Sequence, residues 1–121
     1  MVLAPVPEGL TIRSVYELVE VRLGLRLDFK ISASKTIGTS SEIIAQNNPG
    51  RTNLTIINLS SNTLYVSPVN AASTGNGILL GSGGGALALN YNDDLIQPAL
   101  EWHGVASGSS SAVFVIEAFL L

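Results

Sequence analysis

The chain contains 121 residues with a net charge of −3, and only 12% of its positions are charged, whereas soluble domains average about 25%. An apolar content of 46% excludes a disordered chain, and six Lys and Arg against nine Asp and Glu exclude a strongly basic nucleic-acid binder. The absence of cysteine excludes a disulfide scaffold and a thiolate metal site, and no apolar run is long enough to predict a membrane-spanning helix.

The first ten residues, MVLAPVPEGL, predict an extended arm rather than a helix. Pro5 and Pro7 remove backbone donors and restrict φ, which favours extended backbone. Ser14 and Glu17 then match a capping box, which predicts that one or two helical turns begin there.

A strictly alternating segment follows, from residue 19 to residue 31. Charged residues or glycine separate its apolar members, which are Val19, Val21, Leu23, Leu25, Leu27, Phe29 and Ile31. A period of two predicts a half-buried strand, or two strands that break near Gly24, because a helix would scatter these side chains around its circumference. A single strand of this length would span about 40 Å, so we expect it to bend or to run onto a neighbouring subunit.

Short apolar segments separated by turn residues continue to the C-terminus. The expected strands are 41–46, 54–59, 64–69, 78–80, 87–91, 100–105 and 113–121, with turns at 47–50, 60–62, 81–85 and 92–94. The segments 54–59 and 64–69 also predict a hairpin. About eight strands predict an all-β fold, an antiparallel β-sandwich or jelly-roll-like barrel with an extended N-terminal arm. We assign residues 1–18 to the arm and residues 19–121 to the sandwich.

Few residues could carry chemistry. His103 is the single histidine and stands beside Trp102 in an expected strand, which favours a packed residue over a catalyst. Residues 81–85 are glycine-rich but lack the Lys-Ser/Thr of a phosphate-binding loop, so they predict a flexible hairpin loop. Asp93 and Asp94 lie in a turn without the spacing of a calcium loop. The sequence therefore predicts a protein that is not an enzyme and uses no cofactor or metal.

The charges are placed unevenly along the chain. Of the 15 charged residues, 11 lie within residues 1–51, and the last 70 residues hold four acids and no Lys or Arg. A β domain normally protects its sheet edges and its solubility with charged side chains. Two interpretations stay open: a surface that is neutral by drift, or a surface that other protein subunits cover. The strand pattern and the sparse chemistry favour the second.

Several motifs between residues 46 and 118 follow one pattern. An Asn-Pro-x-Arg turn at 48–51 precedes an L-x-I-x-N strand at 54–58, and a Ser/Asn turn leads to a strand with Tyr-Val at 65–66. A Thr-x-x-Gly-x-x-Leu segment at 74–80, a glycine-rich turn and an S-x-V-x-V-x-E strand at 111–117 complete it. The pattern resembles that of small β-sandwich structural proteins of tailed bacteriophages, of the capsid decoration or cementing type.

The resemblance implies a non-enzymatic protein that decorates or cements a bacteriophage capsid. It would be made in the host cytoplasm and would lie on the capsid surface of the virion. The implied partners are further copies of the chain, as a homotrimer, and the major capsid protein, with no nucleic acid, membrane or small-molecule ligand. We expect the arm and the alternating segment to supply the contact residues, which are Leu3, Pro5, Pro7, Val19, Val21, Leu23, Leu25 and Leu27.

Two alternatives stay open. The chain could be a phage head–tail connector, tail or fibre-associated protein, which belongs to the same structural class. It could instead be a carbohydrate-binding β-sandwich module, with Trp102, Tyr65 and Tyr91 as stacking platforms for a sugar. Three Phe, three Tyr and one Trp are a small stock of aromatic residues, and most of them should serve the core.

Overall fold

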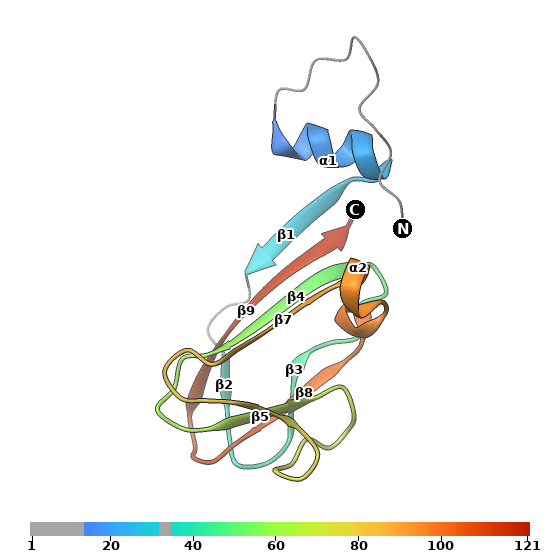
Figure 1. Cartoon of the computed structure of the whole chain (residues 1–121). Coiled ribbons are helices and arrows are strands. Elements are labelled where there is room, and N and C mark those ends of the chain that lie inside the picture. The colour runs from blue at the N-terminus through green and yellow to red at the C-terminus, as the bar shows by residue number, and fades with distance from the viewer. Residues whose placement is uncertain (1–13, 32–34) are drawn as a thin grey trace.

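The computed structural model of the chain describes residues 14–31 and 35–121, and the expectations for the arm before residue 14 lie outside this part. The described chain forms two antiparallel β-sheets packed face to face, with a helix beyond one end of the sandwich (Figure 1). The all-β sandwich predicted from the sequence is therefore confirmed. The elements are α1 (Val15–Leu23), β1 (Leu27–Ile31), β2 (Lys35–Ile37), β3 (Glu42–Ala45), β4 (Arg51–Asn58), β5 (Leu64–Ser67), β6 (Ile78–Leu80), β7 (Ala86–Asn90), α2 (Tyr91–Asp94), η1 (Gln97–Ala99), β8 (Trp102–Ala106) and β9 (Ser111–Leu120).

The strand order is that of a jelly roll. One sheet, here sheet A, has the order β1-β9-β4-β7, with β2 also paired to β9, and the other, sheet B, has the order β3-β8-β5-β6. When β1 and β2 count as one edge strand, sheet A holds the first, eighth, third and sixth strands, and sheet B holds the second, seventh, fourth and fifth. Two sheets linked in this way form the double Greek key of a jelly roll.

The edge of sheet A changes register between β1 and β2. Ile31 pairs with Ile116 and Lys35 pairs with Val113, so four steps along the edge oppose three steps along β9. Because neighbouring side chains in a strand point to opposite faces, this shift reverses which residues of the edge face the core. Ile37 of β2 accordingly points inward and is fully buried.

The hydrophobic core lies between the two sheets. Its fully buried centre consists of Ile37, Leu54, Ile56, Leu64, Val66 and Trp102. The indole Nε1 of Trp102 donates to the carbonyl oxygen of Gln97 at 2.9 Å, so the buried nitrogen keeps a hydrogen bond. The core contains no residue from α1 or β1 among the side chains that the structure describes, although β1 is an edge strand of sheet A.

The expectation of a strand from residue 19 is wrong for residues 19–23, which belong to helix α1. The Ser14 Oγ accepts a hydrogen bond from the Glu17 N–H at 3.2 Å, as the predicted capping box requires. Gly24 ends the helix with φ at 71°, and its N–H donates to the Glu20 carbonyl oxygen. The capping residues at both ends therefore outweigh the alternating pattern between them. The helix also crosses the position between residues 18 and 19 at which the sequence suggested a boundary.

The strand expected over the later part of this segment is confirmed at β1, but its apolar side is not buried. Phe29 and Ile31 are 55% and 52% exposed, respectively. Their pairing partners on β9, Ala118 and Ile116, point away from the core, so the apolar side of β1 lies on the outer face of sheet A. The alternation indicated a strand correctly, while the buried side depends on a register that the pattern does not contain.

The hairpin expected from residues 54–59 and 64–69 is also wrong, because β4 belongs to sheet A and β5 to sheet B. The side chain of Asn58, which is fully buried, holds the crossing between the sheets. Its amide nitrogen donates to the carbonyl oxygens of Asn62, Leu80 and Gly81 at 2.8, 3.0 and 3.2 Å, and its oxygen accepts from the backbone N–H of Ser60. These bonds join the link between the sheets to the β6–β7 loop.

Residues 81–85 form a loop, as expected from their glycines, but the expected hairpin is wrong, because the loop joins β6 of sheet B to β7 of sheet A. A Cβ at Gly85 would lie 2.4 Å from the backbone nitrogen of Gly81, so the close approach of backbone explains this glycine without a ligand. The turn expected at residues 92–94 is instead part of the short helix α2. None of the described helices is long and apolar enough to cross a membrane.

Candidate interaction surface

The outer face of sheet A is the most unusual surface of the molecule. The registers of β1, β4, β7 and β9 place the following side chains on it: Leu27, Phe29, Ile31, Asn53, Thr55, Ile57, Ala86, Ala88, Asn90, Ala112, Phe114, Ile116, Ala118 and Leu120. None of these is charged, and the polar ones are Asn53, Thr55 and Asn90. An antiparallel sheet normally turns one face to the core and one polar face to water. This surface, which we call the outer face, is therefore apolar where a solvated face is expected.

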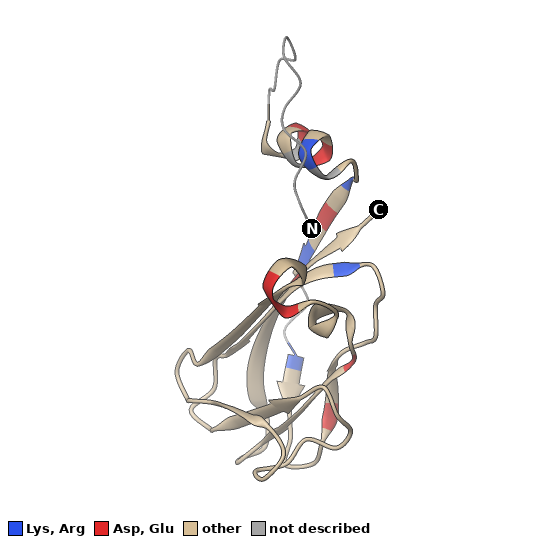
Figure 2. Ribbon diagram, turned by 45° about the vertical axis from the view of Figure 1, so that its right-hand side comes forward, with Lys and Arg blue, Asp and Glu red and all other residues tan. Residues whose placement is uncertain are grey.

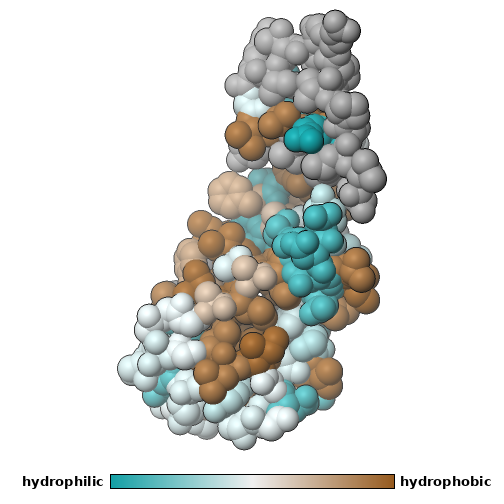
Figure 3. Space-filling model, viewed as in Figure 1, coloured by the Kyte–Doolittle hydropathy of each residue, from teal (hydrophilic) through white to brown (hydrophobic). Residues whose placement is uncertain are grey.

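The charge map agrees with this assignment. The Lys, Arg, Asp and Glu residues of the described chain gather around α1, β1 and α2, and much of the sandwich below them is uncharged (Figure 2). Apolar side chains extend over β1 and along the side of the sandwich that β7 borders (Figure 3). Exposed apolar patches of more than a few hundred Å² usually mark sites of protein association. The uneven charge seen in the sequence thus has a place in the fold.

A second apolar feature lies at the end of the sandwich nearest α1. A pocket of about 240 Å³ there is bordered by Leu25, Leu27 and Leu120 on one side and by Leu95 and Ile96 on the other. Leu95 and Ile96 are 74% and 71% exposed, respectively, and lie just after α2. We call this feature the apolar rim.

The backbone at the apolar rim is strained. Leu95 has φ 57° and ψ −116°, and Ile96 has φ −84° and ψ −9°. These angles describe the two central residues of a type II′ turn, whose first position is normally glycine. A branched side chain at positive φ costs about 1–2 kcal/mol. Because Leu95 buries little of its side chain in return, the turn presents an apolar group outward at a cost in stability.

Replacing Leu95 with glycine is expected to raise the free energy of unfolding by about 1 kcal/mol, because glycine adopts these angles without strain. Ile96→Gly is the matched control, since Ile96 is similarly exposed but has an ordinary φ, and we expect it to be slightly destabilising. Urea unfolding of both variants, followed by circular dichroism, measures the difference. Equal destabilisation by the two variants would contradict the assignment of strain to Leu95.

The inner side of β1 is polar and borders a cleft of about 410 Å³ between the sheets. Glu117 of β9 lies in this cleft with Arg51 of β4, and the Arg51 Nε donates to the Glu117 Oε1 at 2.7 Å. The Nζ of Lys30 lies 3.9 Å from the other Glu117 oxygen. Arg51 also donates to the carbonyl oxygens of Pro98, Leu100 and Gln46. This buried side chain therefore ties sheet A to the segments that enter β4 and β8.

The residues considered for chemistry make local contacts with neighbouring residues. His103 is buried, and its Nε2 lies 3.1 Å from a carboxylate oxygen of Glu101. The carboxylates of Asp93 and Asp94 accept hydrogen bonds from Asn90, which caps α2. In the part of the chain that the structure describes, no three His, Asp or Glu side chains lie close enough together to hold a metal ion.

The contact residues expected from the sequence fall into three groups. Leu3, Pro5 and Pro7 lie outside the described residues. Val19, Val21 and Leu23 belong to α1, while Leu25 and Leu27 border the apolar rim.

Sequence reasoning missed most of the outer face, including Ile57, Phe114 and Ile116, as well as Leu95 and Ile96 at the rim. One signal was available. Strands β4 and β9 carry apolar residues on both sides, as LTII and VFVI, which indicates strands covered on both faces.

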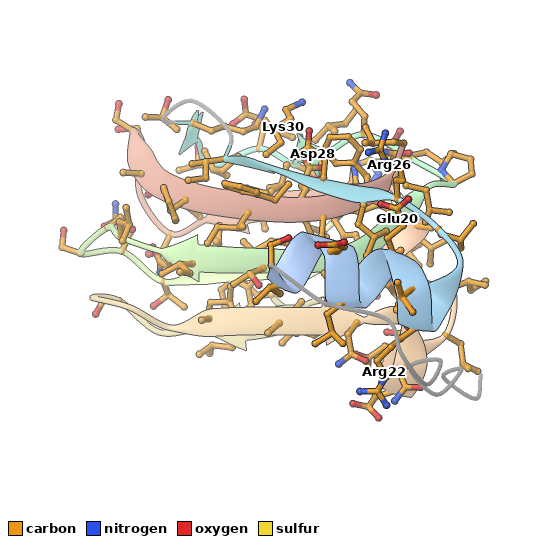
Figure 4. All side chains as sticks on the ribbon, turned by 90° about the horizontal axis from the view of Figure 1, so that it is seen from above. Glu20, Arg22, Arg26, Asp28 and Lys30 are labelled. Atoms are coloured by element: carbon orange, nitrogen blue, oxygen red, sulfur yellow. The ribbon has the colours of Figure 1, made fainter. Side chains whose placement is uncertain are left out.

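Helix α1 joins this surface through β1. The Arg26 Nε lies 3.4 Å from a carboxylate oxygen of Glu20, and the two side chains meet where the helix leads into the strand (Figure 4). Arg22 lies on the opposite side of α1, and Asp28 and Lys30 follow along β1 (Figure 4). Both partners of the Glu20–Arg26 pair are exposed, so the pair adds little stability.

Comparison of the chain with protein-family models, curated proteins and solved structures found no match.

Proposed function

We propose that the chain is a non-enzymatic structural protein of a bacteriophage virion, which decorates or cements the capsid through contacts between subunits and through its N-terminal arm. Its partners would be further copies of the chain, in a homotrimer, and the major capsid protein. The observation that supports this most is the uncharged, apolar outer face, because a protein that is covered in an assembly has no need of a solvated surface there.

Two further features support a structural role. Helix α1 and strand β1 lie beyond the core at one end of the sandwich, where they can contact a neighbour without disturbing the fold (Figure 1). The apolar rim adds exposed leucine and isoleucine side chains beside them. The jelly-roll strand order occurs in viral capsid proteins and in lectins alike, so the fold by itself does not choose between these functions.

The position of Trp102 argues against the carbohydrate-binding alternative. Trp102 is fully buried in the core, so its ring is not available to stack on a sugar. Tyr65 and Tyr91 are each partly exposed but lie on sheet B and on α2, respectively. Of the three residues considered as stacking platforms, Tyr65 and Tyr91 are therefore the ones that keep some exposed surface, and they lie on different elements.

The proposal is tested by the number of copies of the chain in purified phage particles, measured by quantitative mass spectrometry. Hundreds of copies in each particle would support capsid decoration. A dozen copies or fewer would overturn decoration in favour of a connector, tail or fibre-associated role. The absence of the chain from particles would overturn the proposal as a whole.

Deleting residues 1–23 is expected to abolish binding to capsids that lack the chain, while the sandwich stays folded. The deletion removes the arm and α1 but none of the residues of the core, so we expect the melting temperature to change by less than about 4 °C. Co-sedimentation with capsids measures binding, and the emission of the buried Trp102 reports folding. Undiminished capsid binding by the folded, truncated chain would contradict a role for the arm.

A further inference from the structure

Within the part of the chain that the structure describes, β1 is the element that helix α1 contacts most. The helix has nine residues, and isolated helices shorter than about 12–15 residues are marginal in water. Six of the nine residues are Val, Leu or Tyr, a composition typical of a helix that is covered by protein. Yet Val15 is 73% exposed, and none of the α1 side chains that the structure describes is buried. The helix packs against β1 and stands clear of the sandwich (Figure 1).

One side of α1 is suited to an apolar surface. Val15, Leu18 and Val21 follow one another at a spacing of three residues, which places them along one side of the helix. Glu20 is directed towards Arg26. Arg22 points away from Glu20 and lies beside Val15 and Leu18, and its long aliphatic stem can lie along an apolar surface while its charge stays in water (Figure 4). Glu20 is therefore already paired with Arg26 when this side of α1 meets another surface.

The outer face is large enough for such a helix. Its four strands span about 19 Å at the usual spacing, and a strand of five residues is about 17 Å long. A nine-residue helix is about 13 Å long and about 10 Å wide. Layers of helix on sheet are among the stable ways to cover an apolar face of a sheet. In the structure, α1 does not cover the outer face of its own sandwich (Figure 1).

We propose that α1 of one copy of the chain packs on the outer face of a second copy. The outer face places no charge opposite α1, and α1 offers it Val15, Leu18 and Val21, with the aliphatic stem of Arg22 beside them. Contacts of this kind join different patches of the two copies, so they can close into a ring, and three copies would give the homotrimer. The inference rests on the proposed function for its biological setting, but it concerns association between copies and is tested without capsids.

The absence of native cysteine allows a direct test by disulfide trapping. One batch of protein carries Val15→Cys, and a second carries Thr55→Cys, at the middle of the outer face on β4. Mixing the two under mild oxidation is expected to give a disulfide-linked pair that contains one chain of each kind. Leu79→Cys replaces Thr55→Cys as the control, because Leu79 is exposed on β6 of sheet B. Equal trapping by Leu79→Cys, or trapping only between two Thr55→Cys chains, would overturn the proposal.

Association in solution provides the second test. Phe29→Lys places a charge on the exposed part of the outer face, and we expect it to raise the dissociation constant of self-association at least about tenfold, as measured by sedimentation velocity. Val15→Lys on α1 is expected to have a similar effect, whereas Leu79→Lys should have none. A wild-type chain that remains monomeric at high concentration would overturn the inference, as would a Val15→Lys chain that associates normally.

A complementation experiment separates packing of α1 on the outer face from packing of two outer faces on each other. The chain with Phe29→Lys keeps α1 intact, and the chain without residues 1–23 keeps the outer face intact. Neither should associate with itself, but the mixture should form a heterodimer through the one remaining pair of surfaces. Self-association of the truncated chain would instead support contact between two outer faces and overturn the role of α1.

The outcomes distinguish this inference from the proposed function. Copies that associate through α1 but are absent from phage particles would leave the inference standing and remove the proposed function. A chain that is abundant in particles but gives no Val15→Cys/Thr55→Cys pair would support the proposed function and overturn the inference about α1.

Discussion

Replacing Arg51 with alanine is expected to lower the free energy of unfolding by about 3–5 kcal/mol. The side chain is 2% exposed and donates to Glu117 and to backbone carbonyl oxygens. Alanine would leave the Glu117 carboxylate, which is also nearly buried, without its guanidinium partner, and the carbonyl oxygens without a donor. Chemical unfolding followed by circular dichroism measures the loss.

The double variant Arg51→Met/Glu117→Met tests the origin of this loss. If an unpaired buried carboxylate causes most of it, the double variant should be more stable than Arg51→Ala, because apolar side chains of similar size replace both partners. Lys30→Ala is the surface control, since its amine is largely exposed and 3.9 Å from Glu117, and it should cost less than about 1 kcal/mol. A double variant no more stable than Arg51→Ala would show that the carbonyl contacts dominate.

Replacing Trp102 with alanine is expected to cost about 3–5 kcal/mol, because it removes the largest fully buried side chain between the sheets. Trp102→Phe should cost much less, since most of the ring volume stays and only the bond to the Gln97 carbonyl oxygen is lost. Circular dichroism follows unfolding in both variants. A small loss for Trp102→Ala would contradict the position of the ring in the core and reopen the possibility that it serves a ligand.

The sequence predicted the fold class because short apolar segments and turn residues act locally. The turn around Asn48 is an example, since its side-chain oxygen accepts the Gly50 N–H, as Asn in a turn does. The register of a strand and the sheet to which it belongs depend instead on residues that are far apart in the sequence. The link between β4 and β5 has the composition of a hairpin turn, yet Asn58 bonds to the distant carbonyl oxygens of Leu80 and Gly81 and takes the chain across to the other sheet.

The candidate surface was harder to predict for a similar reason. In β9, the run from Val113 to Ile116 is apolar on both sides, so the sequence indicates that both sides are covered but does not say by what. Only the pairing of β9 with β1 and β4 shows that Phe114 and Ile116 share an outward face with Phe29. The apolar rim depends on the positive φ of Leu95. The sequence does not predict this conformation, because the first central position of a type II′ turn is normally glycine and rarely leucine.

The one-residue register shift between β1 and β2 has a consequence for how this edge can change. Before the shift, Phe29 and Ile31 face outward, and after it, Ile37 enters the core. Removing or adding a single residue between positions 31 and 35 would remove the register shift between β1 and β2. Either Ile37 would then leave the core, or the apolar side of β1 would turn away from the outer face. The two registers therefore constrain the number of residues between Ile31 and Lys35, and insertions or deletions there should be poorly tolerated.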